Sequence, residues 1–264
     1  MKHVRIYLFI LSVICLGKLN AQNKTITQKN KPEREVAAPH KVMIIPFEPR
    51  LYLSEIDQRI HNETKLSARE IKYTFRNGLN EQLFKAFKAI GYNALDLMED
   101  TCKYKKDLEG IYEYLTYDFQ KIPNQQNYQA PKKEKSEKKI QKGQLNVETN
   151  DEARFMNARL TSPKLVPILY GKYKTDLFVF INQLDIKAAG SSTSTDQNNT
   201  DQNRKIVVHY TVYSLDAKEI NSGVAEEEFA SDLNNPKKII DRHFSHIAAV
   251  IAQRVNKGLF APAK

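Results

Sequence analysis

Two stretches of the chain repeat apolar residues at the spacing of an amphipathic helix. The first begins with the capping box S-A-R-E at residues 67–70 and is expected to stop at Gly91. The second begins with Asn235 as N-cap and Pro236 as first helical residue, and Gly258 is its expected end. The two apolar stripes consist of Ile71, Phe75, Leu79, Leu83 and Phe87, and of Ile240, Phe244, Ile247, Ile251 and Val255.

Other stretches show the continuous or alternating apolar pattern of β-strands. An apolar run closed by prolines predicts a buried first strand, and three later runs predict an antiparallel meander in which Gly223 marks a β-bulge. The expected strands span residues 41–47, 93–98, 176–186, 206–213 and 220–230.

Three further helices are expected from shorter patterns. One begins at Ser54, and another begins near Asp100 or Asp107 and continues to Phe119. A third short helix is expected around residues 153–160.

These elements predict an α/β (α+β) fold class. We expect a mixed β-sheet with a C-terminal antiparallel meander, covered by the two long amphipathic helices. One domain over residues 41–260 would hold this sheet, with a low-complexity insertion at residues 121–150 and a disordered leader at residues 22–40.

The N-terminus has the pattern of an export signal. Lys2 and Arg5 precede a short apolar run at residues 6–16, and the small residue Ala21 precedes Gln22. The run is about half of the roughly 20 residues that a membrane-spanning helix needs. We therefore expect residues 1–21 to be a signal peptide cleaved between Ala21 and Gln22.

The composition is that of a chain with a buried core, since 41% of the residues are hydrophobic and 27% are charged. The formal net charge of +10 is concentrated partly in one low-complexity stretch. Acidic residues are mixed into this stretch and no aromatic residue interrupts it, so a solvated linker is favoured, with anionic-surface binding as the alternative and nucleic acid disfavoured. Its lysines are Lys132, Lys133, Lys135, Lys138 and Lys139.

The chain contains no motif of a known catalytic, metal or cofactor site. His243 and His246 lie three residues apart on the last predicted helix, but a metal would require further ligands. Glu226 and Glu228 would share one face of a strand, where they are expected to protect a sheet edge or, alternatively, to act as an acid–base pair. Cys102 is expected to be structural. We therefore expect no catalytic residue, no cofactor and no bound metal.

Arg50 and Tyr52 lie in the loop after the first strand. Loops beyond the carboxyl end of a strand are frequent binding positions in α/β sheets. The two residues are therefore a candidate partner-binding loop.

The order of elements resembles a group of periplasmic α/β domains. A strand ending I-I-P-F at residues 44–47 precedes the long helix, an Asp-led apolar strand begins at Asp176, and a hairpin carries a tyrosine and an acidic turn at residues 212–220. These features are similar to the curli-secretion channel protein, the penicillin-binding-protein activator lipoproteins and the N-terminal domain of the Tol-system propeller protein. The chain departs from this group in lacking a lipidation cysteine at the expected mature start and an amphipathic hairpin long enough to build a pore.

The resemblance implies a non-enzymatic role. We expect an exported accessory or assembly protein, in the periplasm or at the outer-membrane periphery, that binds another envelope component. The alternatives are an envelope glycan or peptide hydrolase that uses carboxylates, and a secreted protein that binds anionic surfaces.

Overall fold

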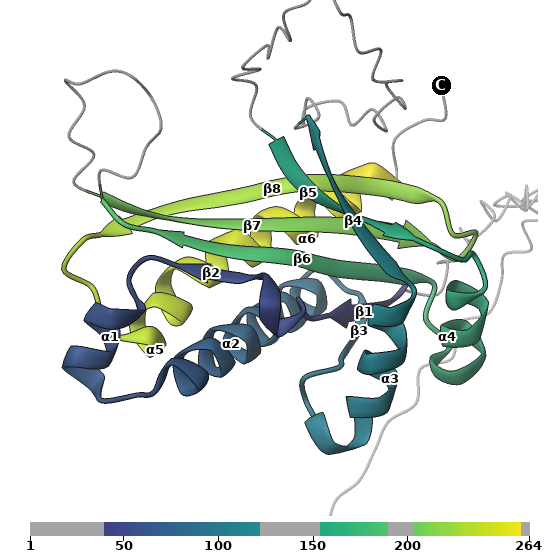
Figure 1. Cartoon of the computed structure of the whole chain (residues 1–264). Coiled ribbons are helices and arrows are strands. Elements are labelled where there is room, and N and C mark those ends of the chain that lie inside the picture. Colours follow the sequence, from purple (N-terminus) through teal and green to yellow (C-terminus); the bar gives the residue numbers. More distant parts are fainter. Residues whose placement is uncertain (1–39, 122–153, 190–202, 260–264) are drawn as a thin grey trace, which may run out of the picture. The chain divides into compact units, whose positions relative to one another are not determined.

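The computed structural model describes residues 40–121, 154–189 and 203–259. It is an α+β fold in which helices pack on a mixed sheet (Figure 1). The strands are β1 (Lys41–Ile45), β2 (Tyr52–Ser54), β3 (Asn93–Asp96), β4 (Leu115–Lys121), β5 (Arg154–Leu160), β6 (Leu177–Lys187), β7 (Asn203–Ser214) and β8 (Glu219–Ala230). The helices are α1 (Asp57–Thr64), α2 (Ala68–Ala89), α3 (Thr101–Glu113), α4 (Leu165–Tyr173), α5 (Pro236–Ile239) and α6 (Ser245–Leu259), with a 3₁₀ turn at Pro49–Leu51 and a π-helical turn at Ile240–Phe244.

The main sheet has the strand order β3-β1-β6-β7-β8. Strands β3, β1 and β6 are parallel, and β6, β7 and β8 form the expected antiparallel meander. After β1 the chain leaves the sheet and returns as β2, which pairs with the later part of β6. The short loop between β1 and β2 therefore lies at the carboxyl end of β1, beside the middle of β6.

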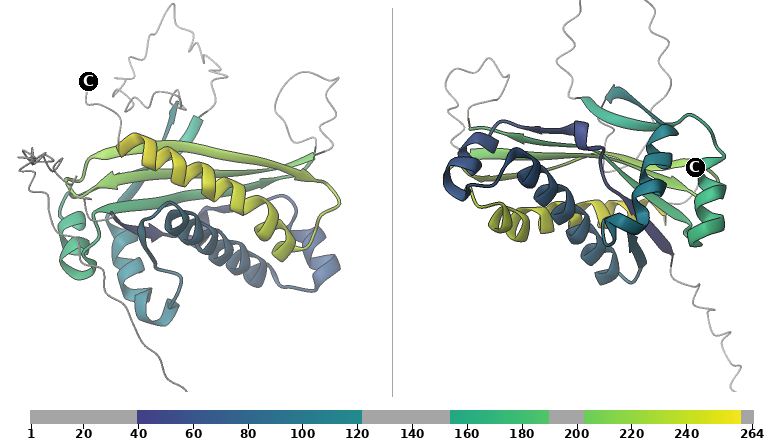
Figure 2. Two further views of the ribbon diagram at one scale, coloured as in Figure 1. Left: turned by 180° about the vertical axis from the view of Figure 1, so that it is seen from behind. Right: turned by 60° about the horizontal axis from the view of Figure 1, so that its bottom comes forward.

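The two long helices cover one face of this sheet (Figures 1 and 2). Helix α2 begins with the predicted capping box of Ser67 and Glu70 and is followed by Gly91 at a φ of 90°. Helix α5, the π-helical turn and α6 together form the C-terminal helical segment, residues 236–259. The predicted apolar stripes of α2 and of this segment are buried against the sheet. Helices α3 and α4 pack on the opposite face, around a second cluster that includes Phe178 and Phe180.

Strands β4 and β5 form a separate antiparallel ribbon. Two predictions fail here. The helix that was expected to reach Phe119 ends at Glu113, because residues 115–121 alternate with the period of a strand and pair with β5. The short helix expected at residues 153–160 is β5 itself, because contacts with β4 and with the main sheet outweigh local propensity.

Smaller corrections concern element ends. Helix α1 begins at Asp57, since Ser54 belongs to β2, and α6 continues through Gly258 to Leu259. The register irregularity of the β7–β8 pair lies between Val212 and Tyr213, whereas Gly223 pairs regularly with Tyr210. Helix α4 had no counterpart among the predicted elements.

Several predictions fall outside the described residues. These are the signal peptide with its cleavage site at Ala21 and Gln22, the leader up to residue 39, and most of the insertion. The lysines of the insertion, Lys132, Lys133, Lys135, Lys138 and Lys139, also lie there.

Candidate functional site

The two residues of the candidate partner-binding loop lie in different environments. Arg50 is exposed and forms an ion pair with Glu48, with 2.7 Å between Nε and Oε2. Tyr52 is buried, and its ring stacks on those of Phe47 and Phe75. Its hydroxyl donates to Asp57 at 2.6 Å, and burial raises its pKa above the ordinary value. Arg50 is thus available at the surface, while Tyr52 supports the loop from below.

Arg76 of α2 fixes the start of this loop. Its Nε donates to the carbonyl oxygen of Phe47 at 2.7 Å, and its Nη2 donates to the hydroxyl of Tyr112 at 2.6 Å. Tyr112, on α3, in turn donates to the carbonyl oxygen of Pro46 at 2.7 Å, and burial raises its pKa to about 12. Helices from both faces of the sheet therefore hold the backbone immediately after β1.

A groove of about 570 Å³ lies beside this loop along α2. It combines apolar and aromatic side chains with three cationic ones and a single carboxylate. The carboxylate, Glu70, is engaged in the capping box, and a hydrogen bond from Ser67 lowers its pKa. The groove is therefore electropositive. Its lining residues are Pro49, Leu66, Arg69, Glu70, Lys72, Tyr73, Thr74 and Arg76.

Tyr73 is the aromatic side chain of the groove that solvent reaches, since half of it is exposed. Lys72 lies with its Nζ 5.9 Å from the centre of the Tyr52 ring, so the buried tyrosine forms part of the support beneath the groove. An arrangement of this kind can bind a partner that offers both negative charge and apolar surface.

Asp96 is a buried carboxylate at the carboxyl end of β3. It accepts hydrogen bonds at 2.8 Å from the Asn80 side chain and from the backbone N–H of Met98, and burial raises its pKa. Among the residues that the structure describes, no cation forms an ion pair with it. Because both of its hydrogen bonds come from the adjoining turn and helix, Asp96 has a structural role.

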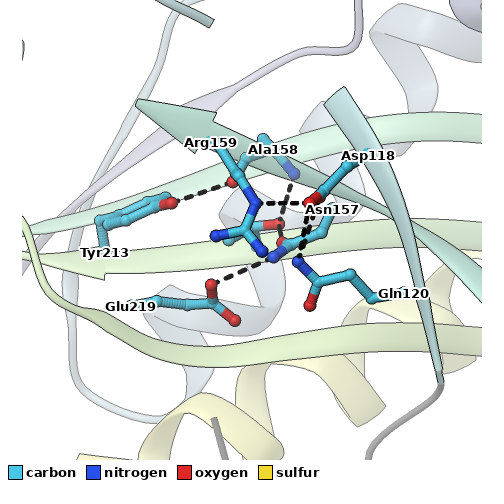
Figure 3. Close-up of polar contacts among 8 residues, drawn as sticks. Asp118, Gln120, Asn157, Ala158, Arg159, Tyr213 and Glu219 are labelled. Atoms are coloured by element: carbon cyan, nitrogen blue, oxygen red, sulfur yellow. Dashed lines mark hydrogen bonds and ion pairs between the residues drawn. The ribbon is translucent and has the colours of Figure 1, made fainter. Parts of the chain in front are cut away.

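A polar network joins the β4–β5 ribbon to the main sheet (Figure 3). Its centre is Thr211 of β7, whose hydroxyl donates to Asn157 and accepts from the backbone N–H of Ala158 at 3.1 Å. Asn182, in the bulge of β6, donates to the same hydroxyl at 2.8 Å. Tyr213 donates to the carbonyl oxygen of Ala158 at 2.9 Å. The network is buried and consists of bonds between β5 and side chains of the sheet.

Charged groups continue this network toward solvent. Figure 3 shows Arg159 directed at Asp118, with 2.5 Å between Nε and Oδ2, and Gln120 on the other side of the same carboxylate. Asn157 also donates to Glu219 at 3.1 Å. Sequence patterns gave no signal for this network, because its members come from the five strands β4 to β8 and meet only in the folded sheet.

His209 anchors the ribbon to the main sheet. Its Nδ1 accepts a hydrogen bond of 2.9 Å from the backbone N–H of Met156, so the ring is held with its proton on Nε2. That nitrogen lies 3.5 Å from Asp185. Both ring nitrogens are therefore occupied by the protein itself.

The histidines of the C-terminal helical segment meet a carboxylate that the sequence did not place near them. The Nδ1 atoms of His243 and His246 lie 3.3 and 3.1 Å from Glu227 of β8. Within the described ranges, no three histidine, cysteine or acidic residues are arranged to hold a metal ion. The contact joins the helical segment to β8.

The neighbouring glutamates point to the other face of β8, as the strand alternation predicts. Glu226 forms an ion pair of 3.5 Å with Lys205, and Glu228 accepts a bond of 3.5 Å from Asn203. Both partners lie on the adjacent strand β7. Cys102 was expected to be a half-buried structural residue, and this is wrong, since it is an exposed free thiol near the start of α3.

None of the helices in the described part of the chain has the length and hydropathy that a bilayer crossing requires.

Comparison with known proteins finds no matching protein family and no matching curated protein. Among solved structures, the hypothetical protein CT253 from Chlamydia trachomatis is similar, with 13% sequence identity and a TM-score of 0.38. The match covers 83% of this chain and 98% of that chain. A similarity of this degree assigns no function.

Proposed function

We propose that this chain is a non-enzymatic, exported accessory protein of the cell envelope that binds another envelope component through the groove along α2. The export part of the proposal rests on the N-terminal pattern, in which Lys2 and Arg5 precede a short apolar run and Ala21 precedes Gln22. The expected location is the periplasm or the periphery of the outer membrane.

The proposal that the chain binds a partner rests on the groove. Arg69, Lys72 and Arg76 line it together with Leu66 and Tyr73. Arg76 is held in place by its two hydrogen bonds, so it can meet a partner without losing conformational freedom on binding. Clusters of aromatic and arginine side chains are the usual centres of protein interfaces.

The charge of the groove indicates the chemistry of the partner. Three cations surround it, and its one carboxylate is occupied by the capping box. The expected partner is therefore an acidic protein segment that presents an apolar side chain to Leu66 and Tyr73. The resemblance to periplasmic accessory domains agrees with a role in binding.

Site-specific photo-cross-linking in intact cells tests this proposal. A photoreactive phenylalanine analogue replaces Tyr73 in the groove, and the same analogue replaces Val250, which is exposed on α6, as the control. We expect one discrete adduct from position 73 and none from position 250. Equal adducts from both positions, or no adduct from position 73, would contradict binding through the groove.

A further inference from the structure

The hydrogen-bond pattern of the β4–β5 ribbon determines which backbone groups point outward. The backbone N–H of Thr161 donates to the carbonyl oxygen of Tyr114 at 2.9 Å, so these residues form a hydrogen-bonded pair. Because such pairs alternate in an antiparallel ladder, the pairs at Thr116, Asp118 and Gln120 also bond to β5. The backbone groups of Tyr117 and Phe119 must then point away from β5.

On the β5 side, the outward groups are satisfied by the main sheet. The N–H of Met156 donates to His209 and its carbonyl oxygen accepts from Asn182. The N–H of Ala158 donates to the hydroxyl of Thr211, and the carbonyl oxygen of Ala158 accepts from the hydroxyl of Tyr213 (Figure 3). Side chains therefore take the place of a third strand on this edge of the ribbon.

On the β4 side, the outward groups have no such partner. Among the described residues, none donates to or accepts from the backbone of Tyr117 or Phe119 on this edge. The Phe119 side chain is 59% exposed. The pairing of β4 with β5 runs without a bulge from Leu115 to Lys121, and β4 contains no proline. Of the usual devices that prevent strand pairing, β4 thus has neither a proline nor a bulge, and its charged residues are Lys121 and Asp118, the latter paired with Arg159.

The long edge strand of the main sheet is different. Strand β8 carries three consecutive glutamates at residues 226–228, and the Arg254 side chain donates to the carbonyl oxygen of Val224. Figure 1 shows that the arrowhead of β4, in contrast, extends beyond the main sheet. A second strand can therefore approach the end of β4 without meeting the sheet.

We propose that this edge is an interface between two copies of the chain, in which two β4 strands pair antiparallel about a twofold axis at Phe119. This inference goes beyond the proposed function and does not depend on the groove. Pairing would join two ribbons into one four-stranded sheet and satisfy the outward N–H and carbonyl groups of both copies. The interface is isologous, as closed dimers require.

Charge and side-chain exposure select this register. The hydrogen-bond phase permits a twofold axis at any residue of β4, and the axes at Tyr117, Asp118 and Phe119 keep most of the strand paired. An axis at Asp118 places two carboxylates opposite each other, and an axis at Tyr117 centres the pairing on a half-buried side chain that is hydrogen-bonded to Glu48 within its own copy. An axis at Phe119 instead pairs the two aromatic rings and places Asp118 opposite Gln120 of the second copy.

Disulfide trapping tests the register. The full chain is used, with both of its cysteines replaced by Cys15→Ser and Cys102→Ser so that only an introduced cysteine can react. Phe119→Cys places two thiols in a hydrogen-bonded pair with Cα atoms about 5.5 Å apart, a separation that a disulfide spans. The matched control, Thr116→Cys, is exposed on the same strand but lies about 20 Å from its counterpart in this register. We expect disulfide-linked dimer from Phe119→Cys to form at least about tenfold faster than from Thr116→Cys, given these separations.

A second variant tests the pairing without cysteine. Phe119→Pro removes an N–H that faces away from β5, so the ribbon ladder is retained while the outer edge loses a donor. We expect the unmodified chain to approach twice the monomer mass in sedimentation equilibrium as concentration rises, and Phe119→Pro to stay monomeric with an unchanged circular dichroism spectrum. Equal trapping of the two cysteine variants, or a monomeric mass for the unmodified chain at every concentration, would overturn the proposal.

Discussion

The hydroxyl of Thr211 is the atom at which three hydrogen bonds of the buried network meet. It accepts from Ala158 and Asn182 and donates to Asn157, all of them buried. Thr211→Val keeps the shape of the side chain but leaves the Ala158 N–H and the Asn157 Oδ1 without their partner, while Asn182 keeps its bond to Met156, so it should reduce the free energy of unfolding by about 2–4 kcal/mol. Urea denaturation measures this loss. Thr211→Ser retains the hydroxyl, so its free energy of unfolding should fall by less than half as much as that of Thr211→Val. Equal losses in the two variants would show that the methyl group, and not the hydroxyl, stabilises the protein.

Asp96 makes stability depend on pH. Because burial raises its pKa in the folded protein above the unfolded value, the folded state holds the proton more tightly, and stability falls as pH rises through the folded pKa. Asp96→Asn keeps an acceptor for Asn80 and Met98 but removes the buried charge. The variant should therefore melt higher than the unmodified protein at pH 7, and the difference should shrink in acid. Thermal melts across pH check this, and a difference that grows in acid would contradict it.

The sequence predicted residue environments only where one element determines them. The stripe of α2 is buried as expected because helical periodicity alone defines its inner face. Tyr52 is different, since it is enclosed by Phe47 and by Phe75 of a helix that starts 16 residues later. Its burial depends on how α2 crosses the sheet, and no local pattern specifies that crossing.

At the scale of elements, the close approach of α2 to the C-terminal helical segment depends on Gly78. A methyl group at this position would lie 2.5 Å from Cδ1 of Ile240. Gly78→Ala gains about 1 kcal/mol of helix propensity but overpacks the contact by about 1–3 kcal/mol, so we expect a net loss. Gly110→Ala in α3, where nothing lies within 4 Å, should gain about 0.5–1 kcal/mol. The denaturation midpoints of the two variants test this prediction. If both substitutions stabilise the protein, α2 and the C-terminal helical segment can move apart to accommodate the methyl group.

The elements that were predicted wrongly are those stabilised by distant partners. Residues 154–160 form β5 because His209, Asn182 and Thr211 bind its backbone on one edge and β4 pairs with the other. If these residues formed a helix instead, the buried side chains of His209, Asn182 and Thr211 would lose their backbone partners. The capping box of α2 and the Asn235 cap were predicted because both signals are local.

At the scale of the whole molecule, the sequence predicted the α+β class and the antiparallel meander, but not the ribbon that crosses the second face of the sheet. The groove could not be predicted either, because Pro49 and the α2 residues that line it meet only after folding. The basic side chains of α2 alone resemble any solvated helix face.

Export has a direct chemical readout. If residues 1–21 are removed on secretion, the protein isolated from cells begins at Gln22. N-terminal sequencing or intact-mass measurement checks this, and Ala21→Leu should slow the cleavage because the small residue before the site is lost. A protein that keeps Met1 in a cytoplasmic fraction would exclude export.

Binding through the groove is the central claim, and charge reversal combined with cross-linking tests it most directly. The photoreactive analogue at Tyr73 is combined with Arg69→Glu and Lys72→Glu, which reverse two of the three cations, and the matched control carries Lys85→Glu and Lys88→Glu farther along the same helix. We predict that the yield of the adduct from position 73 falls at least about tenfold when Arg69 and Lys72 are reversed, because the groove loses the charge that complements an acidic partner. The yield should be unchanged in the control variant. An adduct of unchanged yield after reversal of Arg69 and Lys72 would contradict binding of an acidic partner at this groove.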